Sequence, residues 1–323
     1  MNHIQVAGHL CVDLRPSLGA TGVAVPGELA MVGPMHLSMG GAVGNCGRVL
    51  DDLGVRATLS ACVGADELGE LARRLLGTTH DLDLMEAKGV ATSYSVVVEP
   101  VGEDRSFWHH TGANGAFVGC EVAADRLLHF GYPSLVPGMC ADDGAPIATL
   151  FDRAHAAGVA TSLDLAFVAE NSPVRDLDWT ALLRSALSRT DLFCPSWSDL
   201  VSCLGVPADP DRQTVREWAD RFLEWGAGVV LFTLGDKGCH LRAGERLEDL
   251  AACGIDPAAW SAASLWQIPE PIVEVTTTNG AGDAYKAAFL SRLVEGDGPQ
   301  ECLSFADRVV ARYLKGQPLR PVP

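Results

Sequence analysis

Basic residues are scarce in this sequence. Its 323 residues include 24 Lys and Arg against 41 Asp and Glu, which gives a formal net charge of −17. A surface with this much negative charge repels nucleic-acid phosphates and anionic lipids. We therefore expect neither nucleic acid nor a membrane as a partner. A phosphate-bearing ligand would need locally placed donors or Mg2+.

Long hydrophobic runs and paired cysteines are missing as well. The sequence contains no stretch of about 18 apolar residues, which a membrane-spanning helix requires. Residues 1–6 lack the basic start of a secretion signal. The ten cysteines are irregularly spaced and form no Cys-x-x-Cys pair, a pattern typical of buried free thiols in a reducing compartment. These features predict a cytoplasmic protein.

What the sequence does contain is a regular alternation of short apolar runs and helical patterns. Apolar residues make up 48% of the chain and charged residues 20%, which is ample for a globular core. The predicted strands are 4–7, 57–63, 128–131, 160–165, 191–194, 229–233 and 240–243; the predicted helices are 40–54, 66–76, 145–157, 179–188, 197–204, 213–225, 281–294 and 301–314. This alternation indicates a three-layer α/β/α sandwich around a central, mostly parallel sheet. Residues 245–270 give no clear pattern.

Two segments interrupt the alternation. Residues 14–39 are rich in Gly, Pro and Met without a helical period, and residues 90–112 contain two strand-like runs. We expect these segments to form a small β-sheet lid, with 1–13, 40–89 and 113–323 as the α/β core. Apolar residues exposed on the lid strands predict a homodimer that forms through the lid.

The most informative motif is Thr276-Thr277-Thr278-Asn279-Gly280-Ala281-Gly282-Asp283. The small residues 280–282 allow close approach of a ligand to the backbone, and the apolar run that follows begins a helix. Free N–H groups and the helix dipole at such a start favour a phosphate. Asp283, in the first turn, could then accept a hydroxyl proton. A plain turn with a capping Asp is the alternative that the motif alone leaves open.

Several motifs, taken in order, resemble the ribokinase family of carbohydrate kinases (PfkB type). The motif around Gly280 resembles the second signature of that family, and Gly40-Gly41-Ala42-Val43-Gly44-Asn45 resembles the first. Three further matches are Val63-Gly64-Ala65-Asp66-Glu67-Leu68-Gly69, Gly112-Ala113-Asn114 and Thr233-Leu234-Gly235-Asp236-Lys237-Gly238. The matches cover roughly residues 4–294.

The resemblance implies an ATP-dependent sugar kinase that phosphorylates a primary hydroxyl of a small carbohydrate. Asp283 would be the general base, and Gly280, Ala281 and Gly282 would form the anion hole beside it. The other implied roles are substrate binding by Asp13, Gly40, Gly41, Asn45 and Asn114, nucleotide binding by Thr233, Gly235 and Gly238, and an outer-shell contact of Asp199 with Mg2+. The lid would close over the sugar and exclude water.

The sequence departs from the family pattern at three places. Thr277 stands where the family has Asp, which makes activation by a monovalent cation doubtful. Ser196-Trp197-Ser198-Asp199 replaces the N-x-x-E pattern, and the C-terminal tail lacks an Asn found near the adenine in relatives. A non-catalytic sugar-binding relative therefore stays open.

The lid adds two further points. Its aromatic residues at 107 and 108 leave open a nucleoside kinase and, more remotely, a vitamin kinase. Its His residues lack the spacing of metal ligands, so the sequence predicts no zinc site.

Overall fold

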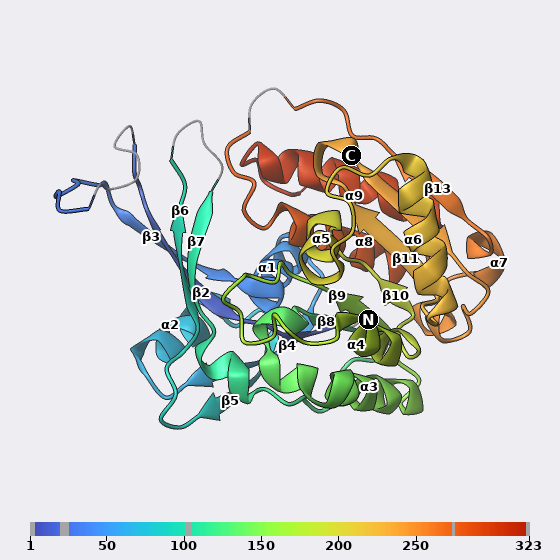
Figure 1. The fold of residues 1–323 in the computed structure, drawn as a ribbon, viewed down its shortest axis with the longest axis horizontal. Coiled ribbons are helices and arrows are strands. Elements are labelled where there is room, and N and C mark those ends of the chain that lie inside the picture. The colour runs from blue at the N-terminus through green and yellow to red at the C-terminus, as the bar shows by residue number, and fades with distance from the viewer. Residues whose placement is uncertain (1–3, 20–25, 101–104, 273–274, 321–323) are drawn as a thin grey trace.

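The fold is built around a sheet of nine strands (Figure 1). The computed structural model describes residues 4–19, 26–100, 105–272 and 275–320. In these ranges the strand order is β13-β12-β11-β10-β9-β8-β1-β4-β5; β12 and β13 are antiparallel to their neighbours and the other pairings are parallel. The strands are β1 (Ile4–Gly8), β4 (Ala57–Gly64), β5 (Asp81–Ala87), β8 (Leu127–Gly131), β9 (Ala160–Asp164), β10 (Leu192–Phe193), β11 (Val229–Thr233), β12 (Cys239–Ala243) and β13 (Ser264–Gln267).

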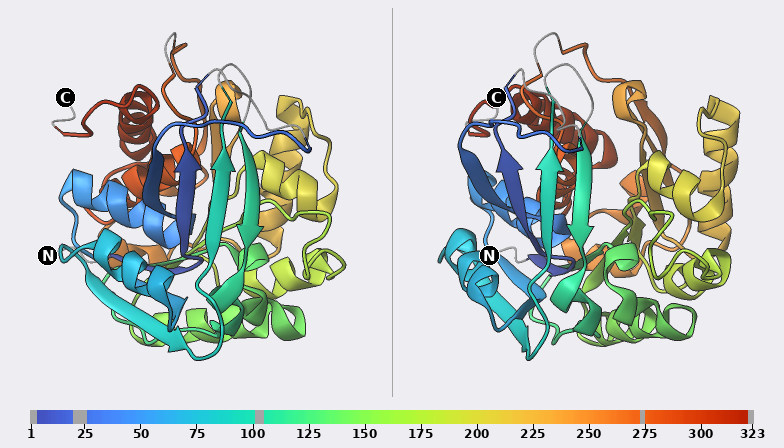
Figure 2. Two further views of the ribbon diagram at one scale, coloured as in Figure 1. Left: turned by 90° about the vertical axis from the view of Figure 1, so that its left-hand side faces the viewer. Right: turned by 60° about the vertical axis from the view of Figure 1, so that its left-hand side comes forward.

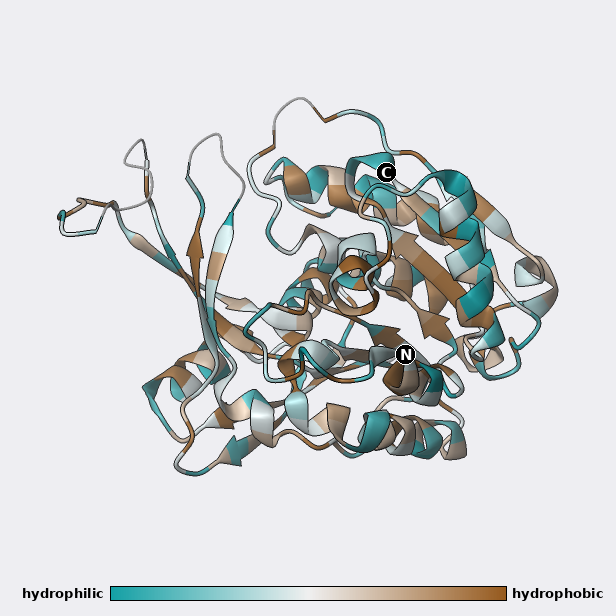
Figure 3. Ribbon diagram, viewed as in Figure 1, coloured by the Kyte–Doolittle hydropathy of each residue, from teal (hydrophilic) through white to brown (hydrophobic). Residues whose placement is uncertain are grey.

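Helices cover both faces of this sheet. Successive side chains of a strand point to opposite faces, so Ile4 and Val6 belong to one buried cluster and Ala7 to the other. The first cluster includes residues of α1 (Gly41–Leu53), α2 (Glu67–Leu76), α7 (Pro257–Trp260), α8 (Ala281–Leu293) and α9 (Pro299–Leu314); the second includes residues of α3 (Ala141–Ala156), α4 (Trp179–Leu187), α5 (Trp197–Leu204) and α6 (Arg212–Glu224). Figure 3 shows hydrophobic residues in β11 and hydrophilic ones along α6. The predicted three-layer sandwich is confirmed.

A second, four-stranded sheet lies to one side, and Figure 2 shows it face-on in its left view. Its order is β3-β2-β6-β7, with β2 (Cys11–Pro16), β3 (Met35–Gly40), β6 (Tyr94–Val98) and β7 (Ser106–His110). Only His9 and Leu10 separate β1 from β2, so this sheet begins at Cys11 rather than at residue 14. The predicted small β-sheet is therefore present, while its action as a lid stays a prediction.

The sequence-based prediction missed two strands of the large sheet and placed the ends of several strands and helices differently from the structure. β5 pairs with β4 at one edge, and β13 pairs with β12 at the other. Edge strands are half-covered, so their apolar runs are shorter and less continuous than those of central strands. β10 has two residues instead of four, and the chain after it pairs with β11 through a single bridge between Ser196 and Thr233.

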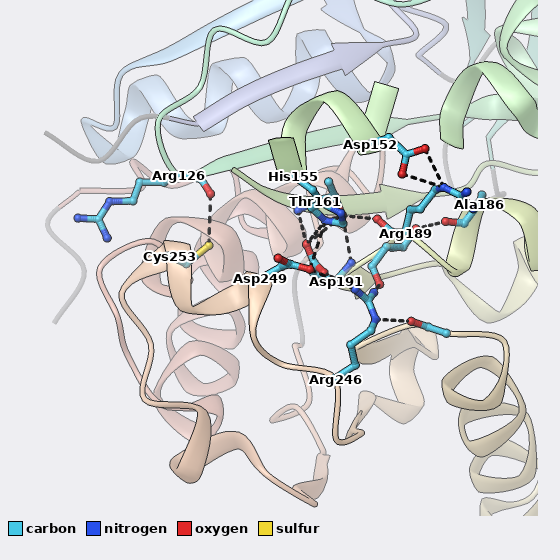
Figure 4. Close-up of polar contacts among 12 residues, drawn as sticks. Arg126, Asp152, His155, Thr161, Ala186, Arg189, Asp191, Arg246, Asp249 and Cys253 are labelled. Carbon is cyan, nitrogen blue, oxygen red and sulfur yellow. Dashed lines mark hydrogen bonds and ion pairs between the residues drawn. The ribbon is translucent and has the colours of Figure 1, made fainter. Parts of the chain in front are cut away.

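A charged network stabilises the edge of the sheet where β9 and β10 begin (Figure 4). Asp191 is buried and accepts hydrogen bonds from Thr161 N at 2.7 Å, His155 Nε2 at 2.9 Å and Arg246 Nη1 at 3.0 Å. The hydrogen bond to Asp191 raises the pKa of His155, against the effect of burial. A carboxylate with this many donors is a structural element rather than an open ligand site.

Two further observations bear on the sequence predictions. None of the helices in the described ranges has the length and hydrophobicity needed to span a membrane. The ten cysteines are all free, and nine of them are buried. Assignment to the cytoplasm stays a prediction.

Candidate active site

The candidate site lies where the parallel strands of the large sheet end. His9 follows β1, Tyr132 follows β8, Asp164 ends β9, Ser196 follows β10 and Thr233 ends β11. Carboxyl ends of parallel strands meet at one edge of a sheet, and open α/β sheets bind their ligands there. The start of α8 adds the anion-hole motif to this edge, since Asp283 contacts residues from both α1 and β8's end.

The turn before α8 has the conformation that an anion hole requires. Gly280 caps the helix with φ +75°, and a Cβ there would lie 2.8 Å from the Tyr313 hydroxyl, so glycine is needed for two reasons. The N–H of Ala281 donates to Thr278 O at 3.2 Å. For the N–H groups of Gly282 and Asp283, no backbone acceptor is found in the described part of the chain. These two N–H groups are the ones available to an anion.

Asp283 is held by hydrogen bonds at both carboxylate oxygens. Its side chain is buried; Asn45 Nδ2 donates to Oδ2 at 2.8 Å, and the Tyr132 hydroxyl donates to Oδ1. Burial raises the pKa of Asp283, while Lys286 and the two hydrogen bonds act in the opposite direction. The Tyr132 phenol makes the contact that an acceptor hydroxyl would make with a general base. The sequence analysis did not identify Tyr132 as a site residue. Its position directly after a buried strand could have indicated it.

Lys286 is a second residue that the sequence analysis missed. It lies one turn after Asp283, and its Nζ donates to Asp164 Oδ2 at 2.5 Å, with both side chains buried. The same Nζ lies 4.0 Å from the position that a Cβ on Gly282 would occupy. The available signal was one cationic residue in the apolar run 284–290.

The electrostatics of this pair favour the charged form of Lys286. Burial alone would lower the pKa of Lys286, but Asp164 and the neighbouring acidic groups raise it above its usual value. Burial raises the pKa of Asp164 to about 8, against the opposing effect of the ammonium group. A positive charge therefore lies beside the available N–H groups of α8.

Asp13 and the two glycines of the first signature are packed against one another. Asp13 is buried on β2, and Asn279 Nδ2 donates to its Oδ2 at 3.3 Å. A Cβ on Gly40 would lie 2.3 Å from Asp13 Oδ1. Gly41 has φ +77°, and its Cβ would lie 2.4 Å from His9 Nδ1. Both glycines are thus required for Asp13 and His9 to occupy their places.

Asn114 has a different environment from the other predicted substrate ligands. It is completely buried, its Oδ1 accepts from Leu10 N at 3.2 Å, and its Nδ2 donates to Leu10 O at 2.9 Å. Its amide therefore fixes the short link between β1 and β2. A direct contact with substrate stays a prediction.

The predicted nucleotide residues form a tight turn beside the start of α5. Gly235 and Gly238 have φ of +62° and +88°, and a Cβ on Gly238 would lie 2.0 Å from Gln267 O. Thr233 bridges to Ser196. A cavity of about 290 Å³ adjoins the turn at Leu234 and Lys237. The turn thus lies at the same edge of the sheet as the start of α8.

Asp199 and Ser196 form a reciprocal helix cap. Ser196 N donates to Asp199 Oδ2 at 2.9 Å, and Asp199 N donates to Ser196 Oγ at 3.2 Å. Burial raises the pKa of Asp199, with Lys286 acting in the opposite direction. The shorter Ser/Asp pair therefore builds a complete capping box in place of N-x-x-E.

Thr277 stabilises the turn before α8, since its hydroxyl accepts a hydrogen bond from Asn279 N at 3.2 Å.

The small sheet touches the anion-hole segment at two points. One is the hydrogen bond between Asp13 on β2 and Asn279. The other is a hydrogen bond from Arg105, just before β7, to the Thr278 hydroxyl. Residues 278 and 279 thus contact the small sheet at β2 and the residue just before β7.

The family is decided by a sequence match over nearly the whole chain. The model of the family described as pfkB family carbohydrate kinase matches residues 1–312. The chain belongs to this family. The chain is also similar to an uncharacterized sugar kinase of Archaeoglobus fulgidus, 22% identical over 269 residues, or 82% of this chain and 94% of that one. Fructokinase-1 of Zea mays is 23% identical over 300 residues, or 89% and 82% of the two chains. The ribokinase of Arabidopsis thaliana is 29% identical over 128 residues, which cover 39% of this chain and 29% of that one.

Solved structures support the same fold for this pfkB-family chain. The ribokinase of Arabidopsis thaliana, complexed with ribose and ATP, has a TM-score of 0.72 at 20% identity, with 98% and 93% of the two chains covered. Phosphofructokinase-2 of Escherichia coli, in complex with fructose-6-phosphate, has a TM-score of 0.71 at 20% identity and covers 98% and 94%. A nucleoside kinase of Methanocaldococcus jannaschii has a TM-score of 0.70 at 16% identity and covers 100% and 95%.

Proposed function

We propose that this pfkB-family kinase transfers the γ-phosphoryl group of ATP to a primary hydroxyl of a small sugar, with Asp283 as general base. The observation that carries the proposal is the buried carboxylate of Asp283 in the first turn of α8. Asn45 of α1 orients this carboxylate by a hydrogen bond. The N–H groups of Gly282 and Asp283 and the ammonium of Lys286 are beside it. A base and an anion-binding group in one helical turn are the arrangement that in-line phosphoryl transfer needs.

The acceptor hydroxyl takes the place of the Tyr132 phenol at Asp283 Oδ1. As the hydroxyl oxygen bonds to the γ-phosphorus, its proton passes to Asp283 and the bond from phosphorus to the β,γ-bridging oxygen breaks. ADP leaves with that oxygen. The negative charge of the transferring group is stabilised by Gly282 N–H, Asp283 N–H and Lys286. Asp13 and Asn45 hold the other sugar hydroxyls through an acceptor and a donor of fixed geometry.

The donor set fits a magnesium ion that is bound mainly by ATP. Mg2+ prefers oxygen ligands, keeps several waters and needs one or two carboxylates besides the phosphates. Asp164 is already paired with Lys286, which leaves Asp199 as the carboxylate that would hold a magnesium-bound water. When bound, the ion neutralises charge on the phosphates. Thr233, Gly235 and Gly238 would lie along the same phosphates.

The test is Asp283→Asn. We expect kcat to fall by about 10²–10⁴-fold, because a general base is lost, while sugar affinity measured by calorimetry stays near the wild-type value. Glu301→Gln is the matched control, because Glu301 is exposed in the first turn of the adjacent helix α9. Unchanged turnover in Asp283→Asn would refute the assignment.

A nucleoside kinase is the second candidate. Phe107 and Trp108 are exposed on β7, where an aromatic ring could stack on a base, and the fold matches the M. jannaschii nucleoside kinase. ADP production with a panel of pentoses, hexoses, sugar phosphates and nucleosides separates the candidates. Binding of a sugar without any phosphorylated product would instead favour a non-catalytic binding protein.

The lid also supplies a proposed dimer interface. β3 and β7 are the two edges of the four-stranded sheet, and Met35 (52% exposed) and Trp108 (65%) present large apolar side chains there. Unpaired edges with apolar side chains favour association with a second copy. Light scattering should therefore give twice the mass of the chain.

A further inference from the structure

Three metal-ligating side chains from separate segments meet beside the proposed sugar site. His9 lies between β1 and β2, Cys11 begins β2, and His109 is on β7. One ligand atom from each residue lies within 4.8 Å of the other two. The rings of His9 and His109 meet edge to face, with centroids 5.1 Å apart. The sequence spacing gave no hint of this group, because the fold brings together the link after β1 and the far edge of the small sheet.

His9 is an unusual residue within this group. It is 2% exposed, and neither of its ring nitrogens has a hydrogen-bond partner in the described ranges. An unpartnered buried polar atom is costly, so such atoms are rare unless a ligand satisfies them. In a neutral imidazole one nitrogen always carries a free lone pair, whichever tautomer is present. The buried nitrogen atoms of His9 therefore point to a missing ligand.

We propose that His9, Cys11 and His109 form a binding site for a thiophilic divalent cation, with Zn2+ as the probe. Two imidazoles and a thiolate are a ligand set that Zn2+ takes in proteins, with bonds of about 2.0–2.1 Å to nitrogen and 2.3 Å to sulfur. In a tetrahedral site such ligands are about 3.3–3.6 Å apart. The observed separations, at most 4.8 Å, require side-chain adjustments of about one ångström.

The surroundings suit this assignment. Ser95 Oγ lies 2.9 Å from His109 Nδ1 and 3.6 Å from Cys11 Sγ, so one hydroxyl contacts two of the three ligands. Hydrogen-bonding groups of this kind orient metal-binding imidazoles.

A second metal-like cluster among the described residues is already satisfied. His155, Asp191 and Asp249 also lie within 4.8 Å of one another, but Arg246 donates to Asp191 at 3.0 Å and lies 3.5 Å from Asp249. A guanidinium neutralises that cluster. The group around His9 contains no cationic side chain.

Metal binding at this site would join the lid to the core. On binding, the Cys11 thiol releases its proton and the thiolate becomes a ligand. That thiol now donates to Asp13 Oδ1 at 3.4 Å, so loading also changes the environment of a proposed sugar ligand. His109 would be tied through the ion to the end of β1, which opposes opening of the lid. We expect reversible inhibition of turnover by micromolar Zn2+, relieved by a chelator, at constant excess Mg2+.

Calorimetric titration of the metal-free protein with Zn2+ is the direct test. The expected result is one site per chain, weakened by more than about 100-fold in His109→Ala, since even residues that only contact a metal ligand change affinity by about 10–100-fold. His110→Ala is the matched control, because His110 is the next residue on β7 and is not part of the group. Equal binding by wild type and His109→Ala, or no binding at all, would overturn the proposal.

A spectroscopic measurement covers the case in which a variant folds poorly. Co2+ bound to the wild type should show a thiolate-to-metal absorption band that Cys11→Ser abolishes and Cys203→Ser retains. A cobalt spectrum without that band would exclude Cys11 as a ligand. The calorimetric and cobalt measurements do not depend on turnover, whereas the inhibition experiment rests on the proposed function. Failure of the metal site can therefore be distinguished from failure of the proposed function.

Discussion

Replacing Lys286 separates its structural role from its proposed chemical one. Lys286→Met leaves Asp164 buried without its partner, and breaking a buried pair from one side costs about 3–5 kcal/mol of unfolding free energy. The two side chains are 4% and 0% exposed and 2.5 Å apart, so solvent cannot replace the lost contact. We expect a loss of unfolding free energy in the upper part of that range, measured by urea unfolding followed by Trp fluorescence. Arg56→Met removes a pair of similar length, 2.7 Å, that is more than half exposed, and should cost under about 1 kcal/mol.

The double variant Asp164→Asn, Lys286→Met removes both charges. Replacing a buried ion pair by neutral groups of similar volume is close to neutral for stability, so most of the lost unfolding free energy should return. Turnover should not return, because the cation beside Gly282 is still missing. Loss of one stabilising group of this kind costs about 10²–10³-fold in kcat.

The assay is ADP release with the best acceptor from the substrate panel, at saturating ATP and acceptor. A double variant that regains both stability and wild-type kcat would show that Lys286 only balances Asp164. A double variant that regains neither would show that the pair is needed for packing beyond its charge. The first outcome would refute the phosphoryl-stabilising role, and the second would refute the expected recovery of unfolding free energy.

Three further predictions concern other parts of the molecule. Tyr132→Phe removes a hydrogen bond that lowers the pKa of Asp283, so the acid limb of kcat/KM should move to higher pH, and a shift to lower pH would contradict the reasoning. The folded-state pKa of His155 is raised above 6.5 by Asp191, so the stability it contributes is complete below pH 6.5 and is lost as pH rises through the raised value. The difference in unfolding free energy between wild type and His155→Gln should therefore shrink with rising pH, and a difference that grew would refute this. Leu37→Asp on the edge strand β3 should halve the mass found by light scattering, whereas an unchanged mass would remove the lid from the interface.

The large sheet and the glycine turn before α8 could be predicted from the sequence because both depend on local pattern. β1 and β4 are completely buried and largely apolar, and Gly280 has a positive φ that other residues rarely adopt. The half-covered edge strands β5 and β13 carry no such continuous signal.

Residues whose role depends on tertiary contacts could not be found in this way. Lys286 can be interpreted only once Asp164 is known to lie 2.5 Å away, and Tyr132 only once its hydroxyl is seen at Asp283. Asn114 was assigned to the substrate by motif, while its amide is bonded to Leu10. Motif spacing identifies which residues gather at a site but not which neighbours they contact.

The two-residue link between β1 and β2 has a consequence for the hydrolysis of ATP by water. Asp13 lies on β2, and Arg105 directly precedes β7 of the same small sheet, so the group proposed to bind the acceptor belongs to the proposed lid. If the small sheet opens as a lid, Asp13 would move away from the acceptor at the same time as solvent enters. We then expect little ATP hydrolysis in the absence of sugar. The groups that align a nucleophile with the γ-phosphorus would come together only when the small sheet is closed over the acceptor.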